Sequence, residues 1–387
     1  MGYNICYNFV KLELLTFKTF IKSFLFIIIL GITIYFVIDK IQYKNNIMGF
    51  EDYSPISTLK VKQTKIRKAK YPFIDVHSHQ FDMPIKDLNN LISDMDSLNM
   101  AFMINLSGFR GYYLRKSIEN INKTAPNRFG VFVNIDFEEI DSKDFIKKNI
   151  KLLNDAKAIG AIGLKVYKSL GLTDMDNKNH RIAVNDSRLD SIWSECGKIG
   201  FPVLIHSGEP SSFWNPKDKF NERWLELKQK PNRYLDPKEY ISYDSILSEQ
   251  HEMFRNNPNT KFINAHLGWM GNDLDRLERH LDELPNVVTE IGAVLAELGR
   301  QPKRAKEFFV KYQDRILFGK DAYNVSEYYT YFRVLESDDE YFNYYRKRHA
   351  HWKMYGLALN DSILKKVYYK NALRLFPSIK RELFIKN

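Results

Sequence analysis

Cysteine is scarce in this sequence, and its scarcity excludes one class of fold. The 387 residues include only two cysteines, Cys6 and Cys196, so a disulfide framework does not hold the chain together. A glycine-rich phosphate loop is also missing after the first expected strand, which argues against a nucleotide-binding sheet. Hydrophobic residues form 44% of the chain and aromatic residues 14%, as in a globular protein with a packed core.

The sequence contains no nucleic-acid-binding motif, although its formal net charge is +11. Residues 1–70 carry 11 Lys/Arg against 4 Asp/Glu, or +7 of this total, so the rest of the chain holds only about +4. A basic tail of this kind is typical of a solvated segment or of one near a membrane surface. We therefore expect no nucleic-acid partner.

Long hydrophobic runs are absent apart from one near the N-terminus. Residues 24–38 contain no charge, and Phe20 and Ile21 extend the run to 20–38 if Lys22 reaches the lipid headgroups. No small residues suited to cleavage follow at 39–43. We interpret residues 1–45 as an uncleaved, single-pass membrane anchor, with the catalytic part on the extracytoplasmic (periplasmic) side. The alternative is a buried core helix.

The next segment, residues 46–70, lacks helical or strand periodicity and ends in KVKQTKIRKAK. Like charges repel one another and keep such a segment extended. We interpret it as a basic tether that leads to a folded domain at 71–387.

Apolar runs of strand length alternate with longer amphipathic stretches after residue 71. The runs are FIDVH, AFMINL, VFVNI, IGLKVY, PVLIH, KFINAH, NVVTEI and RILFG. Eight strand–helix units predict a (β/α)₈ barrel, with an open doubly wound sheet as the alternative. The longest connection, residues 207–238, follows the fifth run and is expected to lie over the barrel mouth.

Histidine and aspartate occur where several of these runs end. His77 and His79 are one residue apart in a strand, so both side chains face one side. His206, His266 and Asp321 end the fifth, sixth and eighth runs, and a barrel gathers its catalytic groups at such strand ends. Neutral imidazoles and a carboxylate are ligands for Zn²⁺ or a similar ion. The sequence therefore predicts a metal site that activates water.

These features together resemble the amidohydrolase superfamily, in the amidohydrolase-related branch that includes α-amino-β-carboxymuconate-ε-semialdehyde decarboxylase. The resemblance extends from about residue 71 to 376 and rests on motifs in the family's order: FIDVHSH, GAIGLKVYKSLGL, VLIHSGEP, FNERWLEL, FINAHLG, AELGRQP, YQDRILFGKDAY and YYKNALRLF. It implies one divalent metal ion, with Zn²⁺ as the first expectation and Mn²⁺ as the second.

The resemblance also implies a role for each residue of the set. His77 and His79 are similar to the first-strand metal ligands, and His206 to the fifth-strand ligand. His266 is similar to the residue that assists the metal-bound water. Asp321 is similar to the eighth-strand residue that is both a metal ligand and the proton acceptor.

Five further residues are candidates for substrate binding. Lys165 is interpreted as a substrate anchor or a buried paired lysine, and the alternative is a carbamylated lysine that bridges two metals. Glu290 is expected at the mouth as a hydrogen-bonding partner, or else it satisfies a backbone group. Arg300 could bind a substrate carboxylate or cap a helix, and Arg110 and Trp214 could line the pocket or hold loops together.

The function that we expect is metal-dependent hydrolysis of an ester, lactone or amide carbonyl in a small substrate that can carry a carboxylate. A non-oxidative metal-dependent decarboxylase is the alternative, because one ligand set and one fold support both reactions. A second alternative is an inactive barrel that acts as a binding protein. The expected partners are the small-molecule substrate and the membrane, and a homodimer with a second copy of the chain is possible as well.

Overall fold

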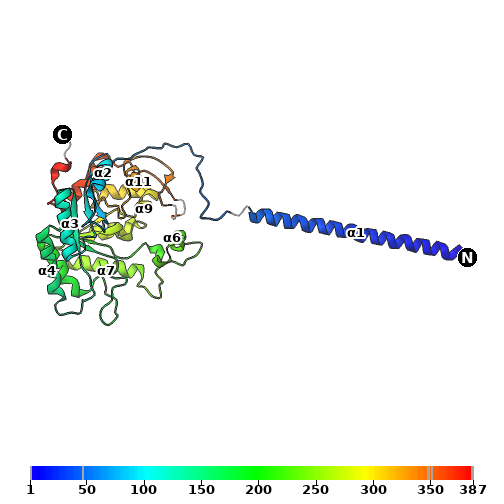
Figure 1. Cartoon of the computed structure of the whole chain (residues 1–387), viewed down its shortest axis with the longest axis horizontal. Coiled ribbons are helices and arrows are strands. Elements are labelled where there is room, and N and C mark those ends of the chain that lie inside the picture. The colour runs from blue at the N-terminus through cyan, green and yellow to red at the C-terminus, as the bar shows by residue number, and fades with distance from the viewer. Residues whose placement is uncertain (1, 46–47, 347–348, 350–351, 385–387) are drawn as a thin grey trace. The chain divides into compact units, whose positions relative to one another are not determined.

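One long helix and a separate compact unit make up the described part of the chain, residues 2–45, 48–346, 349 and 352–384 of a computed structural model (Figure 1). The unit Met1–Thr58 contains α1 (Gly2–Asn45). Its stretch Leu15–Tyr43 is long and apolar enough to cross a membrane, and it includes the apolar segment predicted at 20–38. Such a helix near an N-terminus suits a membrane anchor and a signal sequence alike.

The unit Leu59–Asn387 is built on eight parallel strands paired in sequence order. These are β1 (Phe73–Ser78), β2 (Met100–Asn105), β3 (Phe129–Asn134), β4 (Gly163–Val166), β5 (Val203–Ile205), β6 (Phe262–Asn264), β7 (Val287–Glu290) and β8 (Ile316–Leu317). The last strand returns to the first, because Val76 N donates to Phe318 O at 3.0 Å and Asp321 N to His77 O at 2.7 Å. The predicted (β/α)₈ barrel is confirmed.

The helices lie outside the strands (Figure 1). The longer ones are α2 (Leu88–Leu98), α3 (Gly111–Thr124), α4 (Phe145–Ile159), α5 (Asp190–Ile199), α7 (Tyr243–Asn256), α8 (Leu274–Glu283), α10 (Pro302–Lys311) and α11 (Val325–Glu336). The short ones are α6 (Trp224–Gln229), α9 (Leu295–Arg300), α12 (Asp361–Lys365) and α13 (Asn371–Leu375), and a two-stranded sheet joins β9 (Phe342–Asn343) to β10 (Lys353–Met354).

Helix α2 illustrates how the sequence specifies these elements. Its buried residues, Leu88, Leu91, Met95 and Leu98, recur at helical spacing and face the sheet. The side chain of Asp87 accepts a hydrogen bond from Asn89 N and so caps the first turn. The left-handed conformation of Asn99 then ends the helix.

The barrel interior is filled by alternate residues of the strands. In β1, Ile74 and Val76 belong to the inner cluster. Phe73 packs outward against aromatic rings that include Phe332 of α11, and Asp75 accepts a hydrogen bond from Tyr328 of the same helix. Strict alternation would therefore send His77 outward as well. The register of β1 shifts between Asp75 and Ser78, and a shift of this kind re-aims the side chains that follow.

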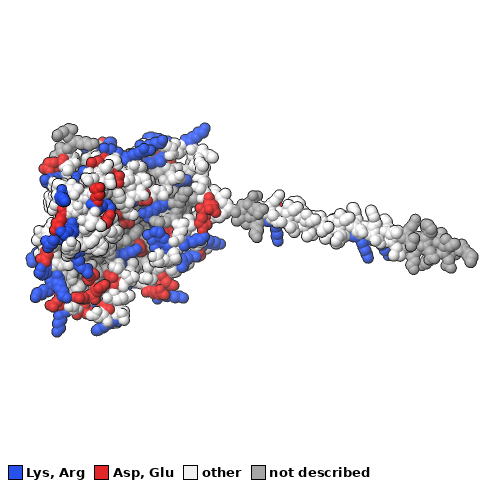
Figure 2. Space-filling view, in the orientation of Figure 1, with Lys and Arg blue, Asp and Glu red and all other residues white. Residues whose placement is uncertain are grey.

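The segment 59–70 belongs to the barrel unit, although we expected it to be the end of the tether. Thr64 donates to Asp339 from its backbone N (2.6 Å) and its hydroxyl (2.7 Å). Lys70 donates to Glu336 and forms an ion pair with Asp361. Acidic residues of the barrel thus bind the basic segment. We expected an extended chain because the positive charges of this segment repel one another. On the face shown in Figure 2, Lys/Arg and Asp/Glu residues are interspersed.

Candidate active site

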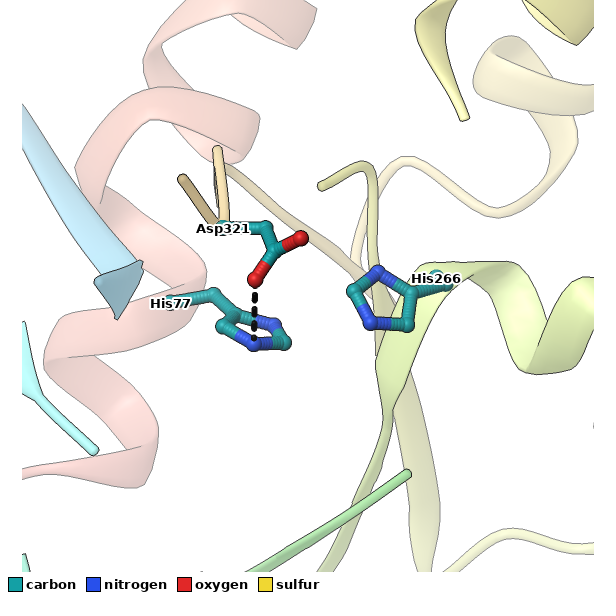
Figure 3. A group of neighbouring side chains, drawn as sticks. All are labelled: His77, His266 and Asp321. Atoms are coloured by element: carbon teal, nitrogen blue, oxygen red, sulfur yellow. Dashed lines mark ion pairs between the residues drawn. The ribbon is translucent and has the colours of Figure 1, made fainter. Parts of the chain in front are cut away.

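Two of the predicted metal ligands, His77 and Asp321, meet the predicted water-assisting residue His266 at the barrel mouth. Ligand atoms of His77, His266 and Asp321 all lie within 4.8 Å of one another. The carboxylate of Asp321 lies between the two rings, with its Oδ1 at 3.5 Å from His77 Nε2 (Figure 3). His79 joins them through its Nε2, 3.6 Å from the same Oδ1. The two first-strand histidines therefore converge on one carboxylate oxygen, as the sequence predicts.

Glu290, at the end of β7, holds two of these histidines in place. Its Oε1 accepts hydrogen bonds from His77 Nδ1 (3.0 Å) and from the backbone N of His266 (2.6 Å), while its Oε2 accepts from Gly292 N (2.5 Å). The side chain is completely buried. Both carboxylate oxygens are thus used within the protein, which agrees with the alternative that Glu290 satisfies backbone groups and makes it a positioning residue.

His266 lies in a left-handed turn that follows β6. His266, Leu267, Gly268 and Trp269 have φ values of 58°, 54°, 60° and 57°. Each non-glycine residue in this conformation costs roughly 1–2 kcal/mol, so the surroundings must hold the turn. Besides the contact with Glu290, His266 Nδ1 donates to Gly292 O at 2.8 Å, and Tyr243 Oη donates to Trp269 O at 2.8 Å.

A hydrogen-bond chain determines the tautomers of His266 and His206. Because the carbonyl of Gly292 only accepts, His266 Nδ1 carries the proton and Nε2 accepts. That Nε2 lies 3.2 Å from His206 Nδ1, which therefore donates. The indole Nε1 of Trp269 in turn donates to His206 Nε2 at 3.2 Å. The lone pair with which His206 would bind a metal is therefore engaged by Trp269.

Burial makes His77, His79 and His206 neutral at pH 7. It lowers the pKa of His79 to about 4, an effect that the Lys165 ammonium reinforces. Burial and neighbouring positive groups likewise lower the pKa of His77 and of His206 well below the usual range. Burial opposes ionisation of Asp321, but the rings of His77, His266 and His79 and the Lys165 ammonium outweigh it and lower the carboxyl pKa. The site therefore presents neutral imidazoles and a carboxylate, which are the forms that bind divalent metals.

One atom shows directly that the site suits a cation. His77 Nε2 is buried and has no hydrogen-bond partner among the described residues, while its Nδ1 proton is donated to Glu290. An unpaired buried acceptor costs about 1–3 kcal/mol. A histidine fixed by a carboxylate on one nitrogen and free on the other is the usual metal-ligand arrangement. The donor set thus fits one divalent ion, with His77 as its best-prepared ligand.

Lys165 is buried in the barrel interior next to these groups. It pairs in register with Leu204, whose side chain fills the inner cluster. Its Nζ has no hydrogen-bond partner among the described residues and lies 5.5 Å from the ring of Tyr167. Burial lowers the pKa of Lys165 to about 8, against the opposing charges of Asp321 and Glu290. The site therefore contains a mostly protonated cation without a paired anion.

A cavity of about 590 Å³ opens beside the metal ligands. It is lined by His79, Gln80, Phe81, Asp82, Lys86, Tyr167, Asp321, Ala322 and Tyr323. A volume of this size accommodates a small molecule. The ring of His79 stacks on two aromatic rings that line the cavity. The centroid distances are 6.0 Å to Tyr167 and 5.7 Å to Phe81.

The other three substrate-binding candidates make structural contacts. Arg300 forms an ion pair with Glu222 at 3.0 Å, and its guanidinium lies 3.6 Å from the ring centroid of Trp352. Arg110 precedes α3 and forms an ion pair with Asp136. Trp214 donates from Nε1 to Ile241 O at 2.8 Å, within the connection after β5. This last contact agrees with the alternative that Trp214 holds loops together.

Trp269, Tyr167 and Ser107 are site residues that the sequence analysis missed. Tyr167 follows Lys165 by two positions, so strand alternation could have placed it at the mouth. Ser107, whose Oγ lies 2.7 Å from His79 Nδ1, follows the second strand. Trp269 gave no signal, because only the left-handed turn brings an indole three residues after His266 back onto His206.

The comparison with solved structures supports the barrel architecture. The chain is similar to 2,6-dihydroxybenzoate decarboxylase from Rhizobium, with a TM-score of 0.51 and 13% identity over 80% of this chain and 100% of that one. It is also similar to an uncharacterised TIM-barrel protein from Bordetella bronchiseptica, with a TM-score of 0.50 and 14% identity over 80% of this chain and 99% of that one. Identities this low show a shared fold. No curated protein matches the chain.

The comparison with family models identifies the family. The model described as "Amidohydrolase" matches residues 117–378, which is more than half of the chain. The matched range includes His206, His266 and Asp321, whereas His77 and His79 precede it and are brought to the site by the fold. The resemblance found in the sequence motifs is thereby confirmed. This chain belongs to the amidohydrolase family, and it is an enzyme of the amidohydrolase superfamily.

Proposed function

We propose that the barrel is a metal-dependent hydrolase acting on an ester, lactone or amide carbonyl of a small carboxylated substrate. The observation that carries this proposal is the buried, unpartnered Nε2 of His77, which faces Asp321 while Glu290 holds the opposite nitrogen. His77, His79, His206 and Asp321 would hold one divalent ion, Zn²⁺ first and Mn²⁺ second. Such an ion makes water nucleophilic at neutral pH and polarises a carbonyl.

The residues around the metal site would handle protons and bind the substrate. Asp321 is ionised and 31% exposed toward the cavity, so its carboxylate accepts the proton of the attacking water. His266, whose Nε2 carries a lone pair, transfers a proton or donates to the developing oxyanion once it is protonated. The unpaired Lys165 ammonium attracts a substrate carboxylate, because a buried cation without an anion gains most from a charged ligand.

A decarboxylase is the second candidate, and Lys165 is the observation that favours it. A buried ammonium beside the ligand set suits a substrate that carries a carboxylate, and this substrate could lose carbon dioxide while His266 or Asp321 protonates its carbon. One of the structures with the same fold is a 2,6-dihydroxybenzoate decarboxylase. We also propose that α1 anchors the barrel to a membrane as a single span, with the barrel on the extracytoplasmic side.

The test combines metal analysis with one substitution. Full-length protein should contain about one divalent ion per chain, and His77→Ala should lose most of it. Asp321→Asn keeps the shape and a ligating oxygen but removes the proton acceptor, so it should retain metal while turnover falls by roughly two to four orders of magnitude. His280→Gln, which changes a histidine on α8, is the matched control and should leave both unchanged.

Lactones, amides and carboxylated aromatic compounds form the substrate panel for this test. Release of carbon dioxide from a substrate of the panel would favour the decarboxylase over the hydrolase. If Asp321→Asn turns that substrate over at the wild-type rate, Asp321 is not the proton acceptor and the proposed mechanism is wrong.

A further inference from the structure

Exposed apolar side chains of the barrel unit gather on one end of the barrel. Among the described residues from 59 onward, eight large apolar side chains are exposed: Leu59, Phe81, Ile85, Phe109, Tyr112, Met175, Phe220 and Val310. Six of them, from Phe81 to Phe220, follow the carboxyl ends of β1, β2, β4 and β5. This is the end at which the cavity opens.

Four of these side chains lie on the loops after β1 and β2 and in the first turn of α3, and Phe81 also lines the cavity. We call them the mouth patch: Phe81, Ile85, Phe109 and Tyr112. The rings of Phe81 and Phe109 lie 6.4 Å apart between centroids. The side chain of Asn120 donates to the backbone oxygens of residues 83 and 86, and so fixes the β1 loop against α3. Tyr112 lies eight residues before Asn120, on the same face of that helix.

The mouth patch is costly to leave in water. Ile85 is 88% exposed and Tyr112 is 76% exposed. Apolar area in water costs about 25 cal/mol per Å², and contiguous apolar patches on soluble surfaces generally mark a site of interaction. Tyrosine with its ring in an apolar phase and its hydroxyl in water is typical of a membrane interface.

A second apolar group lies on the β5 connection, across the ring of strands from β1. Phe220 is 82% exposed, and Lys219 Nζ lies 5.0 Å from its ring centroid. Lys217 Nζ lies 4.4 Å from the ring of Tyr234. Neither lysine forms an ion pair with a carboxylate in the described part of the chain. Unpaired lysines flanking an exposed aromatic ring suit lipid phosphates outside and acyl chains inside.

We propose that the mouth patch and the Phe220 loop dock onto the surface of a lipid bilayer, so that the cavity opens toward the membrane. This inference rests on the proposed anchoring role of α1. Thirteen residues, 46–58, separate α1 from residue 59, and a chain of this length can span up to about 45 Å when extended, so α1 and a face of the barrel can meet the same bilayer. The mouth patch and Phe220 lie on opposite sides of the barrel opening. A bilayer is a broad, fluid surface that can contact both at once, which a second copy of the chain with one apolar patch does less well.

The test uses full-length protein, one chain per nanodisc, in phosphatidylcholine with about a third phosphatidylglycerol to supply the anionic charge that lysines bind. A lipid with a photoreactive diazirine in its acyl chain labels residues that enter the apolar layer, and peptide mass spectrometry locates the labels. We expect labels in residues 15–43, in the mouth patch and at Phe220. The triple variant Ile85→Ser, Tyr112→Ser, Phe220→Ser should reduce labelling of the barrel at least tenfold, whereas Val310→Ser on α10 should not.

The outcomes separate this inference from the proposed anchor. Labels in residues 15–43 without any in the barrel would overturn the docking surface and leave the anchor standing. Labels in neither region would overturn both. Labels in the barrel alone would support docking and contradict the anchor. Each disc holds one chain, so a patch whose true partner is a second copy would not enter the lipid and would remain unlabelled. If the triple variant fails to fold, the labelling of the wild-type barrel alone decides between the bilayer and a second copy.

Discussion

Single hydrogen bonds decide what each histidine of the site can do. Glu290 takes one nitrogen of His77 and leaves the other unpaired, whereas Trp269 and His266 engage both nitrogens of His206. Two histidines of similar chemistry, His77 and His206, therefore differ in their readiness to bind a metal. His77 is prepared, whereas His206 must first exchange the Trp269 hydrogen bond for the ion.

Replacing Trp269 by Phe should tighten metal binding. The substitution removes the indole N–H that engages His206 Nε2 and keeps an aromatic ring in the same place. A net hydrogen bond of about 1 kcal/mol corresponds to roughly a fivefold lower Kd, measurable by competition with a coloured chelator. Trp214→Phe, which removes an N–H bonded to Ile241 O, is the matched control and should leave Kd unchanged. Weaker binding in Trp269→Phe would show that the indole supports the metal ligand.

His280 should contribute to a loss of barrel stability as the pH is lowered, in addition to the buried histidines of the site. Burial, together with His251 and Arg276, lowers the pKa of His280 to about 4. Between pH 6.5 and 4 the unfolded chain therefore binds this proton and the folded chain does not, so the unfolding free energy decreases as pH falls through this range. The His280 contribution is about 2 kcal/mol after allowance for its partial exposure.

Urea unfolding at a series of pH values tests this prediction. His280→Gln should reduce the slope of the unfolding free energy between pH 4 and 6.5, and the buried histidines of the site account for the slope that remains. His180→Gln changes a ring that is 74% exposed, and it should behave like the wild type. Equal slopes in all three proteins would show that His280 does not contribute.

At the scale of elements, the left-handed turn after β6 carries the strain of the site. It bends the chain so that His266 and Trp269 both reach His206, with ring centroids at 4.4 Å and 5.5 Å. Gly268 is the residue of this turn with the least room, since a Cβ there would lie 2.4 Å from Asn264 Nδ2. A regular helical start after β6 would separate these rings.

Gly268→Ala should destabilise the protein more than Gly200→Ala. Both glycines have positive φ, 60° and 70°, but a Cβ at Gly200 would meet no atom within 4 Å. Gly200→Ala thus measures the backbone strain alone, about 1 kcal/mol, and Gly268→Ala should cost about 1–3 kcal/mol more through overpacking. Urea unfolding of both variants gives the difference. Equal losses would mean that the turn yields without displacing Asn264.

At the scale of the whole molecule, the two units of the chain differ in where their apolar side chains lie. Both hydrophobic clusters consist of residues from Ala69 onward, whereas α1 exposes its apolar side chains along Leu15–Tyr43. The barrel therefore has its own core, and the helix requires a different environment. The segment 59–70 belongs to the barrel unit, because it binds acidic side chains of the barrel.

Truncation should locate the start of the barrel unit. Chains that begin at residue 46 or 59 should be soluble and folded, since both keep the contacts of Thr64 and Lys70. A chain that begins at residue 71 loses two hydrogen bonds to the buried carboxylate of Asp339 and should be about 2 kcal/mol less stable in urea unfolding. Aggregation of the chain that begins at 46, with full-length protein well behaved in detergent, would show that α1 belongs to the fold.

The sequence by itself determined the architecture, because apolar runs and amphipathic helices repeat with periods that the backbone geometry imposes. Eight such units and their strand-end histidines indicated a barrel and the place where its ligands gather. Motif order identified the family. The apolar segment at 20–38 could also be predicted from the sequence, since its length and lack of charge are local properties of the chain.

Only the tertiary structure decided how the ligands are aimed and which charges remain unpaired. Strict alternation would have turned His77 toward α11, and the register shift in β1 turns it to the mouth. No spacing rule encodes the hydrogen bond from Trp269 to His206, since it depends on a left-handed turn. The roles of Glu290, Arg300 and Lys165 likewise follow from partners that are far away in sequence. Hydrogen bonds and burial depend on neighbours that folding brings together, whereas periodicity depends on the chain alone.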